Sequence, residues 1–244
     1  MKTLKILTLS LTLFTACQSN NLPIPKEKFS IIIPMKTKQV IQVTTKNWQD
    51  KQGKLQRYEK VEDQWKKVGK EIQIILGRNG LAWGKGLHIT PKNAPYIKKE
   101  GDGKAPAGLF SLGHGFGYKN FNITFPYQTY TRNDHCVDDS NSKFYNTIIN
   151  TDIISKDYRS FEYMKLKNNL YKYGITVKHN PENIAQAGSC IFIHIKSKKN
   201  GGTAGCTTMK ENELINILKW LKEDKNPLLL QLPQEVLKTM KLKK

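Results

Sequence analysis

The residues most able to do chemistry are a histidine and a cysteine that lie close together in the sequence. Eleven residues separate His194 from Cys206, and Gly205 directly precedes the cysteine. A cysteine beside a histidine can carry out nucleophilic acyl transfer, because the imidazole takes the thiol proton and later returns it to the leaving group. The backbone amides of Gly205 and Cys206 are suited to hold the oxyanion of such a reaction. These residues therefore predict a site for cysteine-dependent acyl transfer, with His194 as the base.

Two elements must position this pair. Isoleucines at every second position from 191 to 195 alternate with Phe192 and His194, which predicts a strand that points His194 to one face of a sheet. Beyond the cysteine, Thr208 and Glu211 have the spacing of a capping box. Apolar residues then recur at helical spacing, at Leu214, Ile217, Leu218 and Leu221. We therefore expect Cys206 just before a helix N-terminus, where the thiol pKa falls below its reference value of about 8.5.

At these residues the chain resembles the L,D-transpeptidase catalytic-domain (YkuD-like) family of bacterial cell-wall enzymes. The run Thr203-Ala204-Gly205-Cys206, downstream of a histidine on a strand, is similar to the family's catalytic signature. Four further blocks resemble a divergent branch of the family, in the same order: ILGRNGLAWGKGLH (75–88), EGDGKAPAGLFSLGHGFGY (100–118), CVDDSNSKFYN (136–146) and GSCIFIHI (188–195). The chain departs from the pattern at Ala204, where many members have His, and at Thr208, where many have Arg or Asn. Its interval between histidine and cysteine is also shorter than usual.

This resemblance implies a fold and a reaction. The implied fold is mainly β (α+β): an L,D-transpeptidase-like β-sandwich or barrel with a few helices packed on it, one of them following Cys206. The implied substrate is the peptidoglycan stem peptide, which Cys206 attacks with His194 as general base and then acid. An amine acceptor gives a 3–3 cross-link or attaches a protein to the wall, whereas a water acceptor makes the enzyme an L,D-carboxypeptidase. No cofactor is implied.

Four other residues are candidates for holding the substrate. Thr203 and Thr207 flank the Gly205-Cys206 pair. His179 follows an expected strand and either faces the cleft or is a structural histidine. Asp139 lies in the run from 138 to 141, which either binds a diaminopimelate ammonium or forms an Asx turn. In the resembling family the loop at 101–108 lies near the cleft, so it either lines the substrate site or is a structural turn.

The N-terminal residues predict export. Residues 1–16 have a positive start with Lys2 and Lys5, then an apolar run, and end at Phe-Thr-Ala-Cys, which resembles a lipoprotein signal-peptidase site with Cys17 as the lipidated residue. An ordinary secretory signal with a coincidental cysteine is the alternative. Residues 17–38, with three prolines, are expected to be a tether, and 39–244 the catalytic domain. We expect the periplasmic face of the cell envelope, at the outer membrane if the organism is Gram-negative, with the membrane as a partner through the lipid.

The charge is strongly basic, with 40 Lys and Arg against 20 Asp and Glu and a formal net charge of +20. In a cytosolic protein this excess would indicate nucleic acid as a partner. The export signal argues against nucleic acid, and the lysines are spread along the chain as on a solvated surface. A non-catalytic lipoprotein that binds the wall through this surface is the alternative of another class. The intact His194 and Cys206 pair argues against it.

The cysteine count is consistent with one reactive thiol. Lipidation of Cys17 would leave three of the four cysteines, so that Cys206 is reactive while Cys136 and Cys190 are either paired or buried. The five histidines have no metal-ligand spacing and the sequence has no Cys-x-x-Cys motif, so no metal site is expected.

Elsewhere, alternating patterns predict a largely β domain. Strands are expected over 40–45, 55–61 (after a turn at 51–54), 73–76, 175–177 and 228–232, and a helix over 156–171.

The lipid anchor can be tested directly. The variant Cys17→Ser removes the acceptor of the lipid, so the protein should move from the membrane fraction to the soluble fraction after cell breakage. Immunoblotting of the two fractions measures this. A variant that stays with the membrane would contradict the lipoprotein prediction.

Overall fold

The computed structural model describes residues 30–198, 201–239 and 241–243. The strands are β1 (Ser30–Ile32), β2 (Gln39–Thr45), β3 (Gln52–Val61), β4 (Gln64–Ile75), β5 (Leu81–Trp83), β6 (Ala105–Gly117), β7 (Tyr127–Thr129), β8 (Asp134–Val137), β9 (Ile148–Asn150), β10 (Phe161–Tyr163), β11 (Tyr173–Val177), β12 (Phe192–Ile195), β13 (Thr207–Met209), β14 (Leu228–Pro233) and β15 (Lys241–Lys243). The helices are α1 (Glu211–Trp220), the short 3₁₀ helix η1 (Glu223–Lys225) and α2 (Gln234–Thr239).

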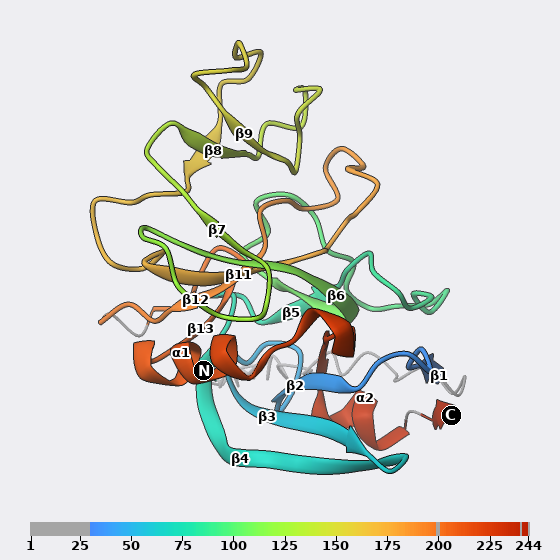
Figure 1. Cartoon of the computed structure of the whole chain (residues 1–244). Coiled ribbons are helices and arrows are strands. Elements are labelled where there is room, and N and C mark those ends of the chain that lie inside the picture. The colour runs from blue at the N-terminus through green and yellow to red at the C-terminus, as the bar shows by residue number, and fades with distance from the viewer. Residues whose placement is uncertain (1–29, 199–200, 240, 244) are drawn as a thin grey trace, which may run out of the picture.

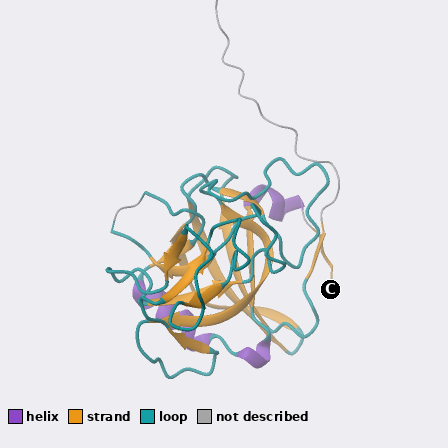
Figure 2. Cartoon of the chain, turned by 90° about the horizontal axis from the view of Figure 1, so that it is seen from above, coloured by secondary structure: helices purple, strands orange, loops and turns teal. Residues whose placement is uncertain are grey.

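Eight strands close into a barrel, in the order β6, β11, β12, β13, β4, β3, β2 and β14, with β14 pairing back onto β6. Viewed from above in Figure 2, the strands curve around a common interior. Most neighbours are antiparallel, but β12 pairs with β13 and β14 with β2 in parallel. The mainly β fold with few helices is therefore confirmed. The strands expected at 40–45, 175–177 and 228–232 correspond to β2, β11 and β14.

A polar contact crosses the barrel interior. Gln231 on β14 is fully buried, and its side chain accepts a hydrogen bond from Thr207 on β13 at 2.8 Å. The same side chain donates to the carbonyl of Pro106 at 2.8 Å. Because β13 and β14 are not neighbours in the barrel, this contact must pass through its interior. Thr207 and Gln231 thus satisfy each other inside an otherwise apolar core.

The turn that leads into β3, the first strand of the long hairpin β3–β4 at the bottom of Figure 1, lies earlier than expected. Residues 52–54 lie inside β3, and the chain turns earlier, where the Asn47 side chain accepts the backbone N–H groups of Gln49 and Asp50. Gly53 is needed within the strand because a Cβ there would lie 2.7 Å from the carbonyl oxygen of Thr44. Asn47 was the sequence signal for this turn, because an asparagine side chain can accept the N–H groups of the residues that follow it.

The predicted helix over 156–171 is wrong. Phe161–Tyr163 is instead strand β10, which pairs with β8, and β8 pairs in turn with β9. This small sheet lies at the top of Figure 1 and has its own apolar centre of Val137, Ile149 and Tyr158. The spacing of aromatic residues in 156–171 is compatible with a strand as well as with a helix. Pairing with β8 decides for the strand.

A disulfide joins the small sheet to the barrel. Cys136 on β8 is bonded to Cys190, which lies just before β12. The sequence had left open whether these two cysteines are paired or only buried. The disulfide closes a loop with a sequence separation of 54 residues and holds the small sheet against the strand that carries His194.

The expected tether is shorter than predicted. Residues from Ser30 onward pack on the domain, since β1 pairs with β15 and Ile31 is only 1% exposed in the apolar core. The signal segment 1–16, Cys17 and the rest of the tether up to residue 29 lie outside the described residues.

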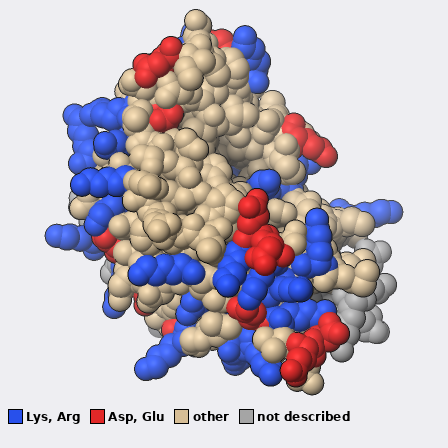
Figure 3. All heavy atoms as spheres, in the orientation of Figure 1, with Lys and Arg blue, Asp and Glu red and all other residues tan. Residues whose placement is uncertain are grey.

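Helix α1 follows β13 and packs onto the barrel through Leu214, Ile217 and Leu218. Within the described part of the chain, no helix is both long enough and apolar enough to cross a membrane. The Lys and Arg side chains are distributed over the face shown in Figure 3, with Asp and Glu among them.

The disulfide should contribute measurably to stability. Replacing both Cys136 and Cys190 by Ser should lower the free energy of unfolding by about 2–5 kcal/mol, because the unfolded chain loses its cross-link. Urea denaturation followed by tryptophan fluorescence measures the change. An unchanged midpoint and slope would contradict a structural role for the bond.

Candidate active site

The parallel pairing of β12 with β13 brings the predicted pair together. His194 lies opposite Thr208, and Cys206 is two residues before Thr208, so His194 and Cys206 project on the same side of the sheet. Both line one cavity of about 210 Å³, together with Tyr171, Glu162 and Thr203. The histidine and cysteine that the sequence singled out therefore share a single pocket.

The thiol of Cys206 is buried. The side chain is 6% exposed, its sulfur accepts the backbone N–H of Phe192 at 3.3 Å, and it donates weakly to the carbonyl of Cys190 at 3.6 Å. Burial raises the pKa of the Cys206 thiol, and the negative charge of Glu162 raises it further. The Phe192 N–H, the charge of Lys98 and the hydroxyl of Tyr171 lower that pKa only in part. The expected lowering of the thiol pKa is therefore wrong, and the resting thiol is neutral.

The helix end expected to lower this pKa is not next to the thiol. Strand β13 separates Cys206 from α1, whose first residue is Glu211. The hydroxyl of Thr208 donates to the carbonyl of Ile75 instead of capping the helix. The cap is formed two residues later, where the side chain of Glu213 accepts the backbone N–H of Lys210. The favourable field of a helix terminus acts mainly within its first turn, so it does not stabilise the Cys206 thiolate.

The imidazole of His194 is oriented as a base. Its Nδ1 lies 2.9 Å from the carbonyl oxygen of Ile195, and only a protonated Nδ1 can donate to a carbonyl. The lone pair is therefore on Nε2. Burial lowers the pKa of His194 to about 4, against smaller opposing effects of the Ile195 and Leu170 carbonyls. Among the described residues no hydrogen bond joins His194 to Cys206, so the pair rests as a neutral imidazole and a neutral thiol.

The turn before Cys206 is fixed by Thr203. Its hydroxyl donates to the Cys206 carbonyl at 2.6 Å and accepts the backbone N–H of Gly205 at 3.1 Å. A Cβ at Gly205 would lie 3.0 Å from the carbonyl oxygen of Lys104, so glycine allows the turn to pack against that loop. An oxyanion would have to take the Gly205 N–H from Thr203. The oxyanion role of the Gly205 and Cys206 amides stays a prediction.

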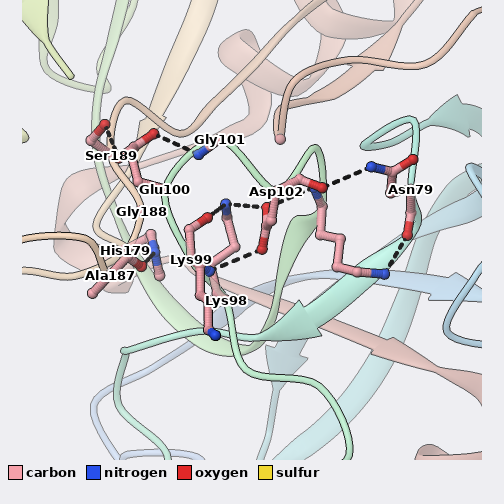
Figure 4. A network of polar contacts seen from close by, with 12 residues as sticks. Asn79, Lys98, Lys99, Glu100, Gly101, Asp102, His179, Ala187, Gly188 and Ser189 are labelled. Carbon is pink, nitrogen blue, oxygen red and sulfur yellow. Dashed lines mark hydrogen bonds and ion pairs between the residues drawn. The ribbon is translucent and has the colours of Figure 1, made fainter. Parts of the chain in front are cut away.

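The loop at 101–108 supports this turn from behind. The carboxylate of Asp102 accepts hydrogen bonds from the Lys98 ammonium and from the backbone N–H groups of Lys99 and Lys104 (Figure 4). The loop is thus held rigid by one aspartate, and its Lys104 backbone meets Gly205. None of its residues lines the cavity that holds Cys206.

Of the four candidates for substrate binding, only Thr203 lines the cavity. Thr207 projects into the barrel toward Gln231, because it is one residue out of phase with Cys206 and Thr208. His179 is buried, its ring contacts the backbone of Lys85 and Ala187, and burial lowers its pKa to about 4 (Figure 4). The carboxylate of Asp139 accepts the backbone N–H groups of Asn141 and Arg159, which is the Asx-turn alternative. The structure thus places these three residues outside the cavity that holds Cys206, in contacts within the fold.

Tyr171 and Glu162 are among the cavity residues that the sequence did not assign to the site. Tyr171 and Glu162 come from the segment between β9 and β11, where polar and aromatic residues alternate without a clear pattern. No local signal marks them, since their position depends on β10 pairing with β8. In the described residues no group of three or more His, Cys, Asp or Glu side chains is placed to hold a metal.

Comparison with known proteins leaves the family open. No family model matches the chain, and no curated protein does. Two solved structures are similar: the helical cell shape determining protein Pgp2 from Campylobacter jejuni, at 16% identity and a TM-score of 0.41, and Bd1075 from Bdellovibrio bacteriovorus, at 14% and 0.38. Each match covers 80% of this chain and 47% of the other, so this chain spans about half the length of both. At such low TM-scores the likeness carries no argument about activity.

The raised pKa of the thiol predicts its reactivity. In a Cys17→Ser background, iodoacetamide should label Cys206 at pH 7 at least about tenfold more slowly than in the urea-unfolded chain, because one pKa unit changes the thiolate fraction about tenfold. The rate should still be rising above pH 9. Intact-protein mass spectrometry under non-reducing conditions follows the label, and Cys206→Ala in the same background is the control without this thiol. A rate that levels off below pH 8.5 would contradict the neutral resting thiol.

Proposed function

We propose that this protein is a cysteine-dependent acyltransferase of the L,D-transpeptidase type that acts on peptidoglycan stem peptides. The observation that carries the proposal is that Cys206 and His194 line the same cavity, with Nε2 of His194 left as the basic nitrogen. The substrate class comes from the resemblance of the Thr203–Cys206 run and its neighbouring blocks to that family. The envelope location and the lipid on Cys17 are part of the same proposal.

The reaction follows from these groups. A substrate carbonyl enters the cavity beside Cys206, the thiol proton passes to Nε2 of His194, and the sulfur bonds to the carbonyl carbon. His194 then gives the proton to the departing amine, which leaves an acyl group on Cys206. Burial disfavours both charged partners before substrate arrives, so proton transfer is coupled to attack on the carbonyl.

The acceptor that removes the acyl group is either an amine or water. The cavity of about 210 Å³ is smaller than the roughly 300–1,000 Å³ of most small-molecule sites. A cross-linking reaction therefore needs a groove for the acceptor peptide beyond this cavity, whereas the L,D-carboxypeptidase alternative needs only water.

A non-catalytic wall-binding lipoprotein is the second candidate. The observation that favours it is the depth of the thiol, which is 6% exposed and makes no hydrogen bond to His194 among the described residues. A protein of this kind would keep the barrel and bind the wall without turnover.

The test is incubation of the protein with a disaccharide tetrapeptide, with and without an acceptor muropeptide. The proposal expects an acyl adduct on Cys206 with loss of the terminal D-amino acid, seen by intact-protein mass spectrometry. Tripeptide alone indicates a carboxypeptidase, and a cross-linked dimer indicates a transpeptidase. A folded protein that gives neither adduct nor product supports the wall-binding candidate.

Variants separate catalysis from folding. Cys206→Ala should abolish turnover and cost only about 1 kcal/mol of stability for the lost buried contact. His194→Gln should lower the turnover rate by about 10²–10⁴, the usual contribution of a general base. His114→Gln is the matched control, because His114 contacts Tyr130 away from the cavity and its loss should leave turnover unchanged. Equal losses in all three variants would contradict the assignment of His194.

A further inference from the structure

A second polar pair lies against the nucleophile. Tyr171 and Glu162 line the same cavity as Cys206, and the Tyr171 hydroxyl donates to the Glu162 carboxylate at 2.5 Å. The phenol ring is held by edge contacts with other rings, at centroid distances of 5.9 Å to Phe116, 5.6 Å to Phe192 and 4.9 Å to His194. The hydroxyl is therefore held against the Glu162 carboxylate, in the cavity that Cys206 also lines.

Glu162 reaches this position from the small sheet. Strand β10 places it opposite Cys136 on β8, where the disulfide ties the sheet to the barrel. Burial, together with the charges of Asp138 and Glu100, raises the pKa of Glu162 to about 6, against the lowering effect of the Tyr171 hydrogen bond. Glu162 therefore changes its charge close to neutral pH.

The two residues act on Cys206 in opposite directions. The negative charge of Glu162 raises the pKa of the thiol, whereas the hydroxyl of Tyr171 lowers it through a side-chain hydrogen bond. A phenol has one hydrogen, so Tyr171 cannot give it to the carboxylate and to the sulfur at the same time.

We propose that Tyr171 is a positioning residue for the Cys206 thiolate, and that the charge of Glu162 decides whether the Tyr171 hydroxyl is available to the sulfur. An ionised Glu162 holds the phenol hydrogen and repels the thiolate. A neutral Glu162 releases the hydrogen to the sulfur and removes the repulsion, while the thiol proton itself goes to His194. The inference rests on the proposed function in taking Cys206 as the nucleophile.

The other charged groups around the pair do not replace Glu162 in this role. Asp138, after β8, and Glu100, before β6, face Glu162, and Glu100 is already held by Tyr145 and Ser189. Lys98 acts on Cys206, but its ammonium is paired with Asp102. Lys196 lines the cavity, but its charge is not among the causes of the Cys206 or Glu162 pKa shifts. Tyr118 acts on Tyr171, and its hydroxyl bonds only backbone groups among the described residues. His194 has a pKa of about 4, so its imidazole is neutral at every pH above that value.

The test is the pH profile of Cys206 alkylation by iodoacetamide in the Cys17→Ser background. Tyr171→Phe removes the hydrogen-bond donor, so below about pH 6, where Glu162 is neutral, its rate should fall about threefold to tenfold, which shifts this part of the profile to higher pH. Glu162→Gln removes the negative charge but keeps the shape, so its rate at pH 7.5, where Glu162 is ionised, should rise by a similar factor and its profile should shift to lower pH. Tyr130→Phe is the matched control, because its hydroxyl contacts His114 instead of the cavity.

Opposite shifts are the result that a packing role cannot give, because loosening the site would increase labelling in both variants. Near-UV circular dichroism and retention of the Cys136–Cys190 disulfide establish that each variant is folded. If Tyr171→Phe does not fold, the test rests on Glu162→Gln by itself. An unchanged or slower alkylation rate of Cys206 in Glu162→Gln then overturns the inference. Parallel shifts in both variants, or none, overturn it as well.

This readout is independent of turnover. Opposite shifts in a protein that forms no acyl adduct would reject the acyltransferase and leave the control of the thiol in place. An acyl adduct together with unshifted profiles would keep the acyltransferase and overturn the role of Tyr171 and Glu162.

Discussion

The parallel register between β12 and β13 is the constraint on which the site depends. It sets His194 opposite Thr208 and so directs His194 and Cys206 to one face, while Thr207 points inward to Gln231. A shift of one residue would exchange these faces and put the thiol inside the barrel. The buried bond between Thr207 and Gln231 opposes such a shift, because breaking it would leave two polar groups unpaired in the core.

The loops around this pair keep the register and the turn rigid. Thr203 bridges to Gly77 and its hydroxyl holds both Gly205 and Cys206. On the other side, the side chain of Asn146 accepts the backbone N–H of Cys190 and donates to the backbone of His179 and Asn180. The segments before both reactive residues are thus fixed by side-chain hydrogen bonds to backbone, which strand pairing alone would not provide.

Burial determines the electrostatic state of the site. Cys206 and His194 are both buried, so a thiolate or an imidazolium would lose most of its hydration in this site. A neutral resting pair protects the thiol from alkylation and oxidation, because the thiolate is the reactive form. Nearby polar groups such as Tyr171 and Glu162 therefore have large effects on the thiol pKa, since little solvent lies between to screen them.

The sequence by itself determined the chemistry-bearing pair, the strand under His194, the helix after Cys206 and the mainly β class, because these follow from local spacing and period. It did not determine the pKa of the thiol, the roles of Thr207 and His179, the pairing of Cys136 with Cys190 or the strand at 161–163. Each of these depends on contacts between segments far apart in the chain, which no local pattern encodes. Tyr171 and Glu162 became part of the site only in the tertiary structure, where β10 pairs with β8 and carries a carboxylate to the thiol.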